Sequence, residues 1–257
     1  MSIAIHNVDF RYSEEKPTLQ SLNLEIADGE FVLLTGQNGA GKSTILKLLN
    51  GILKPATGSI IIDGLDTHLT KTSVLASHIA VTFQNPGDQI FASTVRKEIL
   101  YGPTILRRPN SGALADHALE LFHLGEFATR HPYDLSLAHR KLLTLASAVS
   151  SDAPILAFDE PTASLSQPER KVLLSAMHEL RNLKHTIIVV SHDLDFFVSE
   201  ASKLVVLNNG RIAHIGKPQD IVRDRRIARY AGLKLPLSLR IQRIGEAAPS
   251  HDARVIS

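Results

Sequence analysis

The chain has 257 residues, of which 44% are hydrophobic and 21% charged, and its formal net charge is +2. This composition excludes a disordered chain, allows one domain with or without an inserted lobe, and gives no indication of nucleic-acid binding. The chain has no cysteine, which excludes disulfides and thiolate metal sites and is compatible with a reducing cytosol. No apolar run reaches the roughly 18 to 20 residues of a transmembrane helix, and residues 1–10 lack a signal peptide's apolar core, so we expect any membrane link to go through a partner.

The first 26 residues alternate between apolar and polar side chains, which predicts antiparallel strands with one buried face. The apolar positions fall into three groups: Ile3 and Ile5; Val8, Phe10 and Tyr12; and Leu22, Leu24 and Ile26. Tyr12, at the end of the second group, can stack on a nucleotide base, although an aromatic there more often covers the core.

Residues 36–44 read GQNGAGKST and fit the phosphate-loop pattern G-x-x-x-x-G-K-[ST]. A buried strand is predicted before the loop at 31–34, and a helix after it, ending at Asn50-Gly51. The glycines let backbone N–H groups converge on a polyphosphate at the helix N-terminus. Lys42 can then reach the β- and γ-phosphates, and the Ser43 hydroxyl can bind Mg²⁺. We expect the loop to bind ATP through Gly36, Gln37, Asn38, Gly39, Ala40, Gly41, Lys42, Ser43 and Thr44.

Strands are also predicted at 59–62 and 79–83, and the second ends at Gln84. A polar side chain at the end of a strand in an open α/β sheet lies where such sheets bind ligands. Gln84 is therefore a candidate to contact Mg²⁺ and the γ-phosphate, although on its own it is an ordinary loop residue.

Residues 93–149 have a helical pattern and predict a helical lobe inserted into an α/β core. One helix is expected from Val95 to Tyr101, ending at Gly102-Pro103, and a loop at 107–112. Another has an apolar stripe of Leu114, Ala118, Leu121 and Phe122. The last helix of the lobe begins near Ser136, a plausible N-cap whose helix end can meet an anion.

Residues 154–161 combine an apolar run with two acids and predict a buried strand that delivers carboxylates to the ligand edge of the sheet. Asp159 is expected to hold Mg²⁺, and Glu160 to polarise the attacking water as general base. In isolation such a run is commonly a strand followed by a solvated turn, but the phosphate loop in the same chain favours the site.

The remaining elements complete the core. Ser166 begins a helix with a buried stripe of Leu173, Ala176, Met177 and Leu180. A strand at 186–191 then delivers His192, which can hydrogen-bond a γ-phosphate oxygen and the attacking water, although a lone histidine at a strand end is usually structural. A hairpin is predicted at 204–215, and residues 221–257 hold eight Arg or Lys against three acids, which favours a solvated or partner-facing surface over a nucleic-acid site.

The order of these segments resembles that of the ATP-binding-cassette (ABC) ATPases. An aromatic at Tyr12, the phosphate loop, Gln84, a signature at 135–140, Asp159-Glu160 and His192 follow one another over about residues 1–220. Within that superfamily, the stretch FQNPGDQIF at 83–91, with Thr94-Val95 and residues 101–103, is similar to the ATPase subunits of energy-coupling factor (ECF) importers, which take up vitamins and transition-metal ions. The tail at 232–236 is similar more weakly.

The resemblance implies a P-loop NTPase (RecA-like) core with an antiparallel β subdomain and an inserted helical subdomain, followed by a basic C-terminal extension at 221–257 that contacts a partner. It implies an ATPase with Mg·ATP, at the cytoplasmic face of the membrane. Ser136 would contact the nucleotide held by a second ATPase, Gln84, Lys42, Glu160 and His192 would act in hydrolysis, and Ser43, Gln84 and Asp159 would bind the metal. The pair would grip a transmembrane coupling protein, which holds a small membrane-embedded substrate-binding protein.

Two departures from the family pattern matter. The family's signature is L-S-G-G-Q, but Leu137, Ala138 and His139 stand at its last three positions, and Ser166 stands where an aspartate is expected. In the family this segment contacts the γ-phosphate held by the opposite subunit, where glycine permits close backbone approach, so the Leu137 and Ala138 side chains should crowd that contact. We therefore expect a hetero-dimer in which this chain's phosphate loop works with an intact partner signature, while the reciprocal site hydrolyses ATP poorly.

Other functions stay open. A soluble ABC ATPase acting on nucleic acid or protein would need no membrane partner, and the stretch at 85–89 counts against it. A regulatory nucleotide-binding subunit with little turnover would fit the altered signature, but Glu160 and His192 are intact. No acceptor-binding signature for a phosphoryl-transfer kinase is visible.

Overall fold

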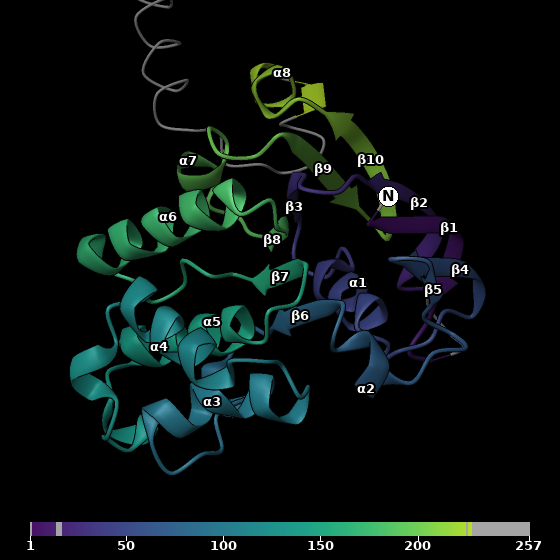
Figure 1. Cartoon of the computed structure of the whole chain (residues 1–257). Coiled ribbons are helices and arrows are strands. Elements are labelled where there is room, and N and C mark those ends of the chain that lie inside the picture. Colours follow the sequence, from purple (N-terminus) through teal and green to yellow (C-terminus); the bar gives the residue numbers. More distant parts are fainter. Residues whose placement is uncertain (1, 14–16, 225, 228–257) are drawn as a thin grey trace, which may run out of the picture.

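The computed structural model describes residues 2–13, 17–224 and 226–227, which form two β-sheets and a set of helices (Figure 1). The larger sheet has six strands in the order β10-β9-β3-β8-β7-β6. Its central strands run parallel, and only β10 is antiparallel to its neighbour. The strands are β3 (Phe31–Gly36), β6 (Ile79–Thr82), β7 (Ile155–Asp159), β8 (Thr186–Val190), β9 (Lys203–Asn208) and β10 (Arg211–Gly216).

The larger sheet is buried on both faces, which explains why its strands are continuous apolar runs in the sequence. In β3, Phe31 and Leu33 face one hydrophobic cluster, whereas Val32 and Leu34 face the other. The strands β7, β8 and β9 alternate in the same way. The first cluster contains α3–α7, and the second contains α1 and the smaller sheet.

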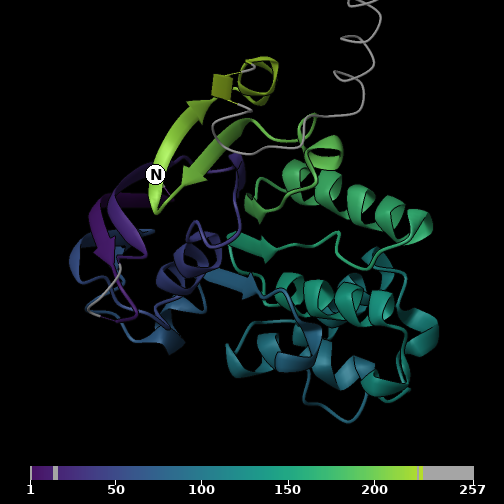
Figure 2. The same cartoon turned by 180° about the vertical axis from the view of Figure 1, so that it is seen from behind.

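The smaller sheet is antiparallel, with the order β2-β1-β4-β5. In both views α1 lies between it and the larger sheet (Figures 1 and 2). Its strands are β1 (Ile3–Phe10), β2 (Leu19–Ile26), β4 (Thr57–Ile62) and β5 (Leu65–Asp66). The first two predicted strands are in fact one. Asn7, at a φ of 47°, lies where the register with β2 shifts, so the buried positions change from odd to even numbers within β1.

The helices cover the two faces of the larger sheet. They are α1 (Lys42–Leu49), α2 (Thr72–Leu75), α3 (Val95–Ile105), α4 (Ser111–Leu121), α5 (Leu137–Ser150), α6 (Gln167–Asn182), α7 (Leu194–Phe197) and α8 (Pro218–Arg223). Short 3₁₀ turns lie at η1 (Pro86–Asp88), η2 (Gly125–Phe127) and η3 (Pro132–Asp134). The helices α3, α4 and α5 pack on one another and form a helical lobe (Figure 1). Among the described residues, no helix is both long and apolar enough to cross a bilayer.

The predicted end of the first lobe helix at Gly102-Pro103 is wrong, because α3 continues through both residues to Ile105. A proline inside a helix leaves the carbonyl four residues earlier without its usual N–H donor. Here that carbonyl belongs to Ile99, and the buried hydroxyl of Ser150 on α5 donates to it at 2.7 Å. A tertiary contact therefore replaces the missing helix bond.

Other predictions hold with small changes. The buried stripe of α6 is Leu173, Ala176, Met177 and Leu180, as predicted. In α4 the fully buried residues are Ala115, Ala118 and Leu119, so its stripe is turned slightly relative to the predicted one, with Leu114 and Leu121 half-buried. Tyr12 lies two residues beyond the end of β1 and does not end a strand. Of the basic tail, residues 225 and 228–257 lie outside the described residues. The segment 232–236, which is similar to the ECF ATPases, is among them.

Candidate ATP site

A cavity of about 660 Å³ lies at the edge of the larger sheet where β3, β6 and β7 end. The size is in the usual range for small-molecule sites. Eleven of the predicted site residues line it together: Tyr12, Asn38, Gly39, Gly41, Lys42, Ser43, Thr44, Gln84, Asp159, Glu160 and His192. Sequence positions separated by more than a hundred residues thus meet at one place.

The glycine loop forms because its backbone needs conformations that other residues rarely adopt. Gly36 has a φ of 145°, and a Cβ there would overlap the carbonyl oxygen of Leu207 on β9. Gly41 has a φ of 101° and is the N-cap of α1. Among the residues that the structure describes, no side chain caps this helix end, and no acid lies in its first turn, so its N–H groups are available to an anion.

Lys42 is buried and its ammonium donates to the carbonyls of Gly36 at 2.8 Å and Gln37 at 2.9 Å. Burial lowers the pKa of Lys42, and the carboxylates of Glu160 and Asp159 act in the opposite direction. A lysine held by its own loop is positioned to exchange these carbonyls for phosphate oxygens.

Asp159 is almost fully buried at the end of β7, and burial raises its pKa. A hydrogen bond from Ser43, together with the positive charges of Lys141, Lys42 and Lys47, lowers the pKa in part. The hydroxyl and the carboxylate that were predicted to bind the same metal therefore lie close to each other.

Glu160 has its backbone in the left-handed region, with a φ of 47°, and its N–H donates to the Val190 carbonyl of β8 at 2.8 Å. Ser191 donates to Glu160 Oε2 at 3.1 Å. The other carboxylate oxygen, Oε1, is buried and has no hydrogen-bond partner among the described residues. Burial raises the pKa of Glu160, which suits a general base, while the Ser191 bond lowers it.

His192 and Tyr12 lie at the rim of the cavity. His192 Nε2 is 3.7 Å from Glu160 Oε1, too far for a hydrogen bond but close enough for a water or phosphate oxygen to contact both. The Tyr12 ring packs edge-on against Phe10, and its hydroxyl is 3.2 Å from Thr44 Oγ1. Gln84 is exposed and lies two residues beyond the end of β6, so the predicted strand 79–83 ends one residue earlier than expected.

Some predicted site residues do not line the cavity, and some residues that line it were not predicted. Gly36, Gln37 and Ala40 build the loop without lining the cavity. Ser136 also lies outside the lining. Thr18 and Ala163 line the cavity but belong to no motif. The Ser191 contact with Glu160 was missed as well, since it depends on how β7 and β8 pair.

The signature segment begins α5 as predicted, with Ser136 as N-cap. Its hydroxyl accepts from the His139 N–H at 3.2 Å and lies 2.7 Å from His139 Nδ1. Leu137 follows with half of its surface exposed. The Ser136 hydroxyl is therefore engaged within its own helix.

The residues present fit Mg²⁺ if the phosphates of a bound nucleotide supply further oxygen ligands. Among the described residues no group of three or more His, Asp or Glu could hold a metal ion. The Ser43 hydroxyl, the Gln84 amide and the Asp159 carboxylate are oxygen ligands, and Mg²⁺ is typically bound by few protein oxygens plus substrate phosphates.

A glycine loop between a parallel strand and a helix, with acids at the end of β7, two strands away in the same parallel sheet, defines a P-loop ATPase. The chain matches the ABC transporter family over residues 19–163, more than half of its length, and it belongs to that family. It is an ATP-binding subunit that couples ATP hydrolysis to transport.

Its relatives include ECF transporters' ATP-binding proteins. It is 33% identical over 238 residues to EcfA of Methanothermobacter thermautotrophicus, covering 91% of this chain and 76% of that protein. It is also 33% identical over 238 residues to EcfA1 of Mycoplasma pneumoniae, covering 92% of this chain and 86% of that protein. Among solved structures, cbiO1 of Clostridium perfringens, part of the ABC transporter complex cbiONQ, has a TM-score of 0.78 at 26% identity and covers 94% of this chain and 98% of that one. The MJ0796 cassette, in a dimeric post-hydrolysis state with ADP and Pi, has a TM-score of 0.77 at 25% identity. The match covers 84% of this chain and 98% of that one.

Proposed function

We propose that this chain powers an ECF-type importer in which Mg²⁺-dependent ATP binding and hydrolysis drive uptake of a vitamin or a transition-metal ion. The observation that supports this most is the convergence of the eleven predicted residues on one cavity. The names of the relatives support the importer class. We further propose that residues 1–220 form the ATPase domain, with 93–149 as its helical subdomain, and that 221–257 contacts a partner.

The proposed roles follow from the side chains. The N–H groups of the loop and Lys42 bind the phosphates, and Tyr12 stacks on the base. Glu160 takes the proton of the attacking water at Oε1, the oxygen that Ser191 leaves free. His192 holds the same water or a phosphate oxygen in place. Ser43, Gln84 and Asp159 would hold Mg²⁺, which when bound supplies positive charge to the phosphates.

We propose that the chain works in a hetero-dimer, at the cytoplasmic face of the membrane. The dimeric state of the MJ0796 cassette supports pairing in general. The exposed Leu137 and the internally bonded Ser136 support a poor contact with a partner's nucleotide. One competent site would then consist of this chain's cavity and an intact signature from a different ATPase.

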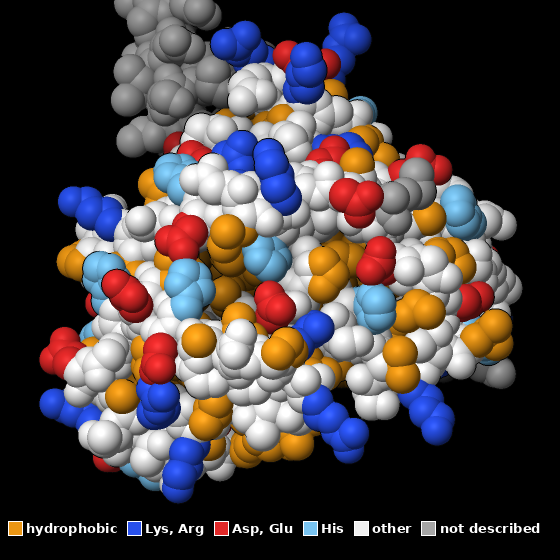
Figure 3. Space-filling model, in the orientation of Figure 1, with side chains coloured by type: hydrophobic (Ala, Val, Ile, Leu, Met, Phe, Trp, Pro, Cys, Tyr) orange, Lys and Arg blue, Asp and Glu red, His pale blue; other side chains and the backbone are white. Residues whose placement is uncertain are grey.

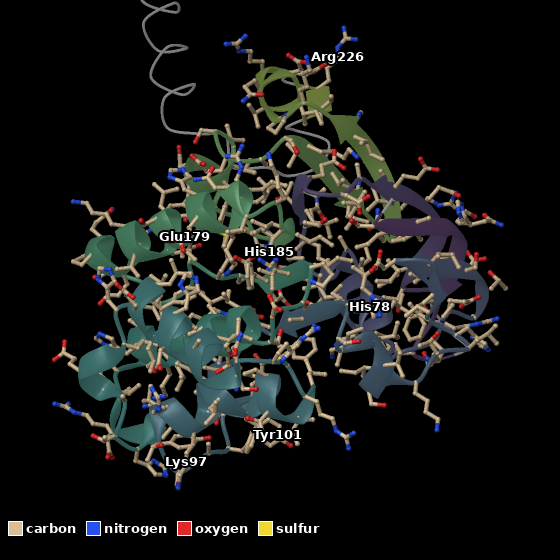
Figure 4. All side chains as sticks on the ribbon, in the orientation of Figure 1. His78, Lys97, Tyr101, Glu179, His185 and Arg226 are labelled. Carbon is tan, nitrogen blue, oxygen red and sulfur yellow. The ribbon has the colours of Figure 1, made fainter. Side chains whose placement is uncertain are left out.

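An apolar groove supports contact with the transmembrane coupling protein. A second cavity, of about 340 Å³, lies between the helical lobe and β6, with the exposed aromatics Phe91 and Tyr101 at its rim. Tyr101 is visible on the outer side of the lobe (Figure 4). We propose that a short apolar segment of the coupling protein fills this groove.

The experiment is to solubilise membranes, purify the full chain, and identify the proteins that accompany it. The proposal predicts a second ATPase and integral membrane proteins, with slow ATP hydrolysis by the isolated chain and fast hydrolysis by the complex. Fast, cooperative hydrolysis by the isolated chain would contradict the hetero-dimer.

One alternative has a specific observation in its favour. The engaged Ser136 hydroxyl fits a regulatory subunit that binds ATP with little turnover. On the face shown in Figure 3, acidic, basic and histidine side chains are interspersed, so this face has no continuous basic patch for nucleic acid. Unchanged turnover of the complex after Glu160→Gln would favour the regulatory function.

A further inference from the structure

Lys141 is a fully buried lysine that the proposed mechanism does not use. It lies on α5, five residues after the N-cap Ser136, and only 1% of its surface is exposed. A buried ammonium is costly unless its hydrogen-bonding capacity is satisfied. An apolar side chain of similar length at this position would avoid that cost, so the contacts of Lys141 need an explanation.

The ammonium group of Lys141 meets three backbone carbonyls. Nζ donates to Asp159 O at 2.9 Å, to Gln84 O at 3.1 Å and to Phe83 O at 3.3 Å. An ammonium has three donors, so all are used. The acceptors lie at the ends of two neighbouring strands, β6 and β7, from which the Gln84 and Asp159 side chains enter the cavity.

The charge of Lys141 also acts on the acids. Burial lowers the pKa of Lys141 to about 8, and the carboxylates of Asp159 and Glu160 act in the opposite direction. In return, the positive charge of Lys141 is one of the factors that lower the pKa of Asp159. The ammonium of Lys141 therefore offsets part of the negative charge of the acid pair.

A second contact joins α5 to the segment after Gln84. The hydroxyl of Tyr133, just before α5, donates to Gly87 O and Ile90 O, each at 3.3 Å, and Arg140 lies over the Tyr133 ring. Lys141 on α5 thus contacts both the segment 83–90 and the end of β7. Tyr133, which precedes α5 and contacts Arg140 on it, adds a second connection to the segment 83–90.

We propose that Lys141 is a positioning residue for ATP hydrolysis: its ammonium holds the ends of β6 and β7 together so that Gln84 and Asp159 face the same metal and phosphate oxygens, and it fixes the signature helix to that arrangement. The inference rests on the roles proposed above for Gln84, Asp159 and Glu160.

The test compares Lys141→Met, which removes the charge and the donors, with Lys141→Gln, which keeps one amide donor group, one bond closer to the backbone. Lys97→Met is the matched control, since Lys97 is exposed on the outside of the helical lobe (Figure 4). ATP affinity of the full chain is measured in EDTA and in Mg²⁺. ATP hydrolysis is measured in the co-purified complex, per site that binds ATP in EDTA, so that unfolded protein does not lower the rate.

We expect Lys141→Met to leave the ATP dissociation constant in EDTA within about twofold of the wild type, because the glycine loop is untouched. The gain in affinity from Mg²⁺ and the kcat should both fall about 10- to 100-fold, as for loss of an outer contact to a metal ligand, with KM changed much less. Lys141→Gln should recover part of both losses, and Lys97→Met should change neither.

The inference is overturned if Lys141→Met keeps the wild-type gain in ATP affinity from Mg²⁺ and the wild-type kcat. It is also overturned if Lys141→Gln recovers neither quantity relative to Lys141→Met. Glu160→Gln is run in parallel to separate the two proposals. If it leaves kcat unchanged, the proposed roles of the site fail. If it abolishes turnover while Lys141→Met does not, only the role of Lys141 fails.

Discussion

Glu160 is the residue on which the chemistry of the site depends. Its free Oε1 lies beside His192, and its pKa is raised by burial. We expect Glu160→Gln to lower kcat of the complex by about 10²- to 10⁴-fold, because the amide cannot accept the proton, while ATP affinity stays within a few fold. Steady-state hydrolysis and equilibrium binding test this, with the exposed Glu120→Gln on α4 as control. Turnover equal to that of the wild type would contradict the role.

Lys141 makes the stability of the nucleotide-free and metal-free chain depend on pH. Its pKa is about 8 in the folded chain and 10.5 ordinarily, so between these values the unfolded chain binds more protons. Stability attributable to this residue therefore rises with pH across that window. We expect the unfolding free energy of the wild type, relative to Lys141→Met, to increase by on the order of 3 kcal/mol from pH 8 to pH 10.5. Urea denaturation at several pH values measures the difference, and a constant difference would contradict the prediction.

Residue identity alone predicted most of the side chains that line the cavity but not the groups behind them. Gly36 to Thr44, Gln84, Asp159 and His192 follow patterns at strand ends, where side chains meet ligands. Lys141 lies within a helix and follows no such pattern, and Ser191, although at the end of a predicted strand, was not singled out. Their importance depends on which carbonyl or carboxylate the fold brings within 3.5 Å of them, which is a tertiary property.

At the scale of elements, the path of α3 through Pro103 depends on one hydroxyl. Ser150→Ala would leave the buried Ile99 carbonyl without a donor, because Pro103 has no N–H. We expect a loss of about 1–3 kcal/mol in unfolding free energy, measured by urea denaturation.

The matched test is a double-mutant cycle. Pro103→Ala restores an N–H that can donate to Ile99 O within the helix, so Ser150→Ala should cost clearly less in the Pro103→Ala chain than in the wild type. Equal costs in both would show that the hydroxyl does not serve this carbonyl.

Elements were predictable where the hydrophobic period is regular. The stripe of α6 and the apolar runs of β3, β7 and β8 matched the structure because both faces of the sheet and one face of the helix are buried. The exceptions have local causes. A bulge at Asn7 merges two predicted strands into β1, and the Ser150 hydroxyl lets α3 pass the proline that was predicted to end it.

At the scale of the whole molecule, the account requires two unequal ATP sites. Leu137→Gly combined with Ala138→Gly would remove the side chains that crowd a partner's γ-phosphate. We expect ATP turnover of the assembled complex to rise about twofold, because two working sites replace one. Leu183→Gly, at an exposed leucine after α6, is the control. An unchanged rate would contradict the proposed defect of the signature.

Equilibrium binding of ATP to the full chain, in Mg²⁺ and in EDTA, is to be compared between the wild type and Lys42→Ala. We propose that the glycine loop, Asp159, Glu160 and His192 surround one triphosphate. This arrangement predicts one site per chain, tighter with Mg²⁺, and at least about 10-fold weaker in Lys42→Ala. Binding without any dependence on Mg²⁺, or unaffected by Lys42→Ala, would contradict it.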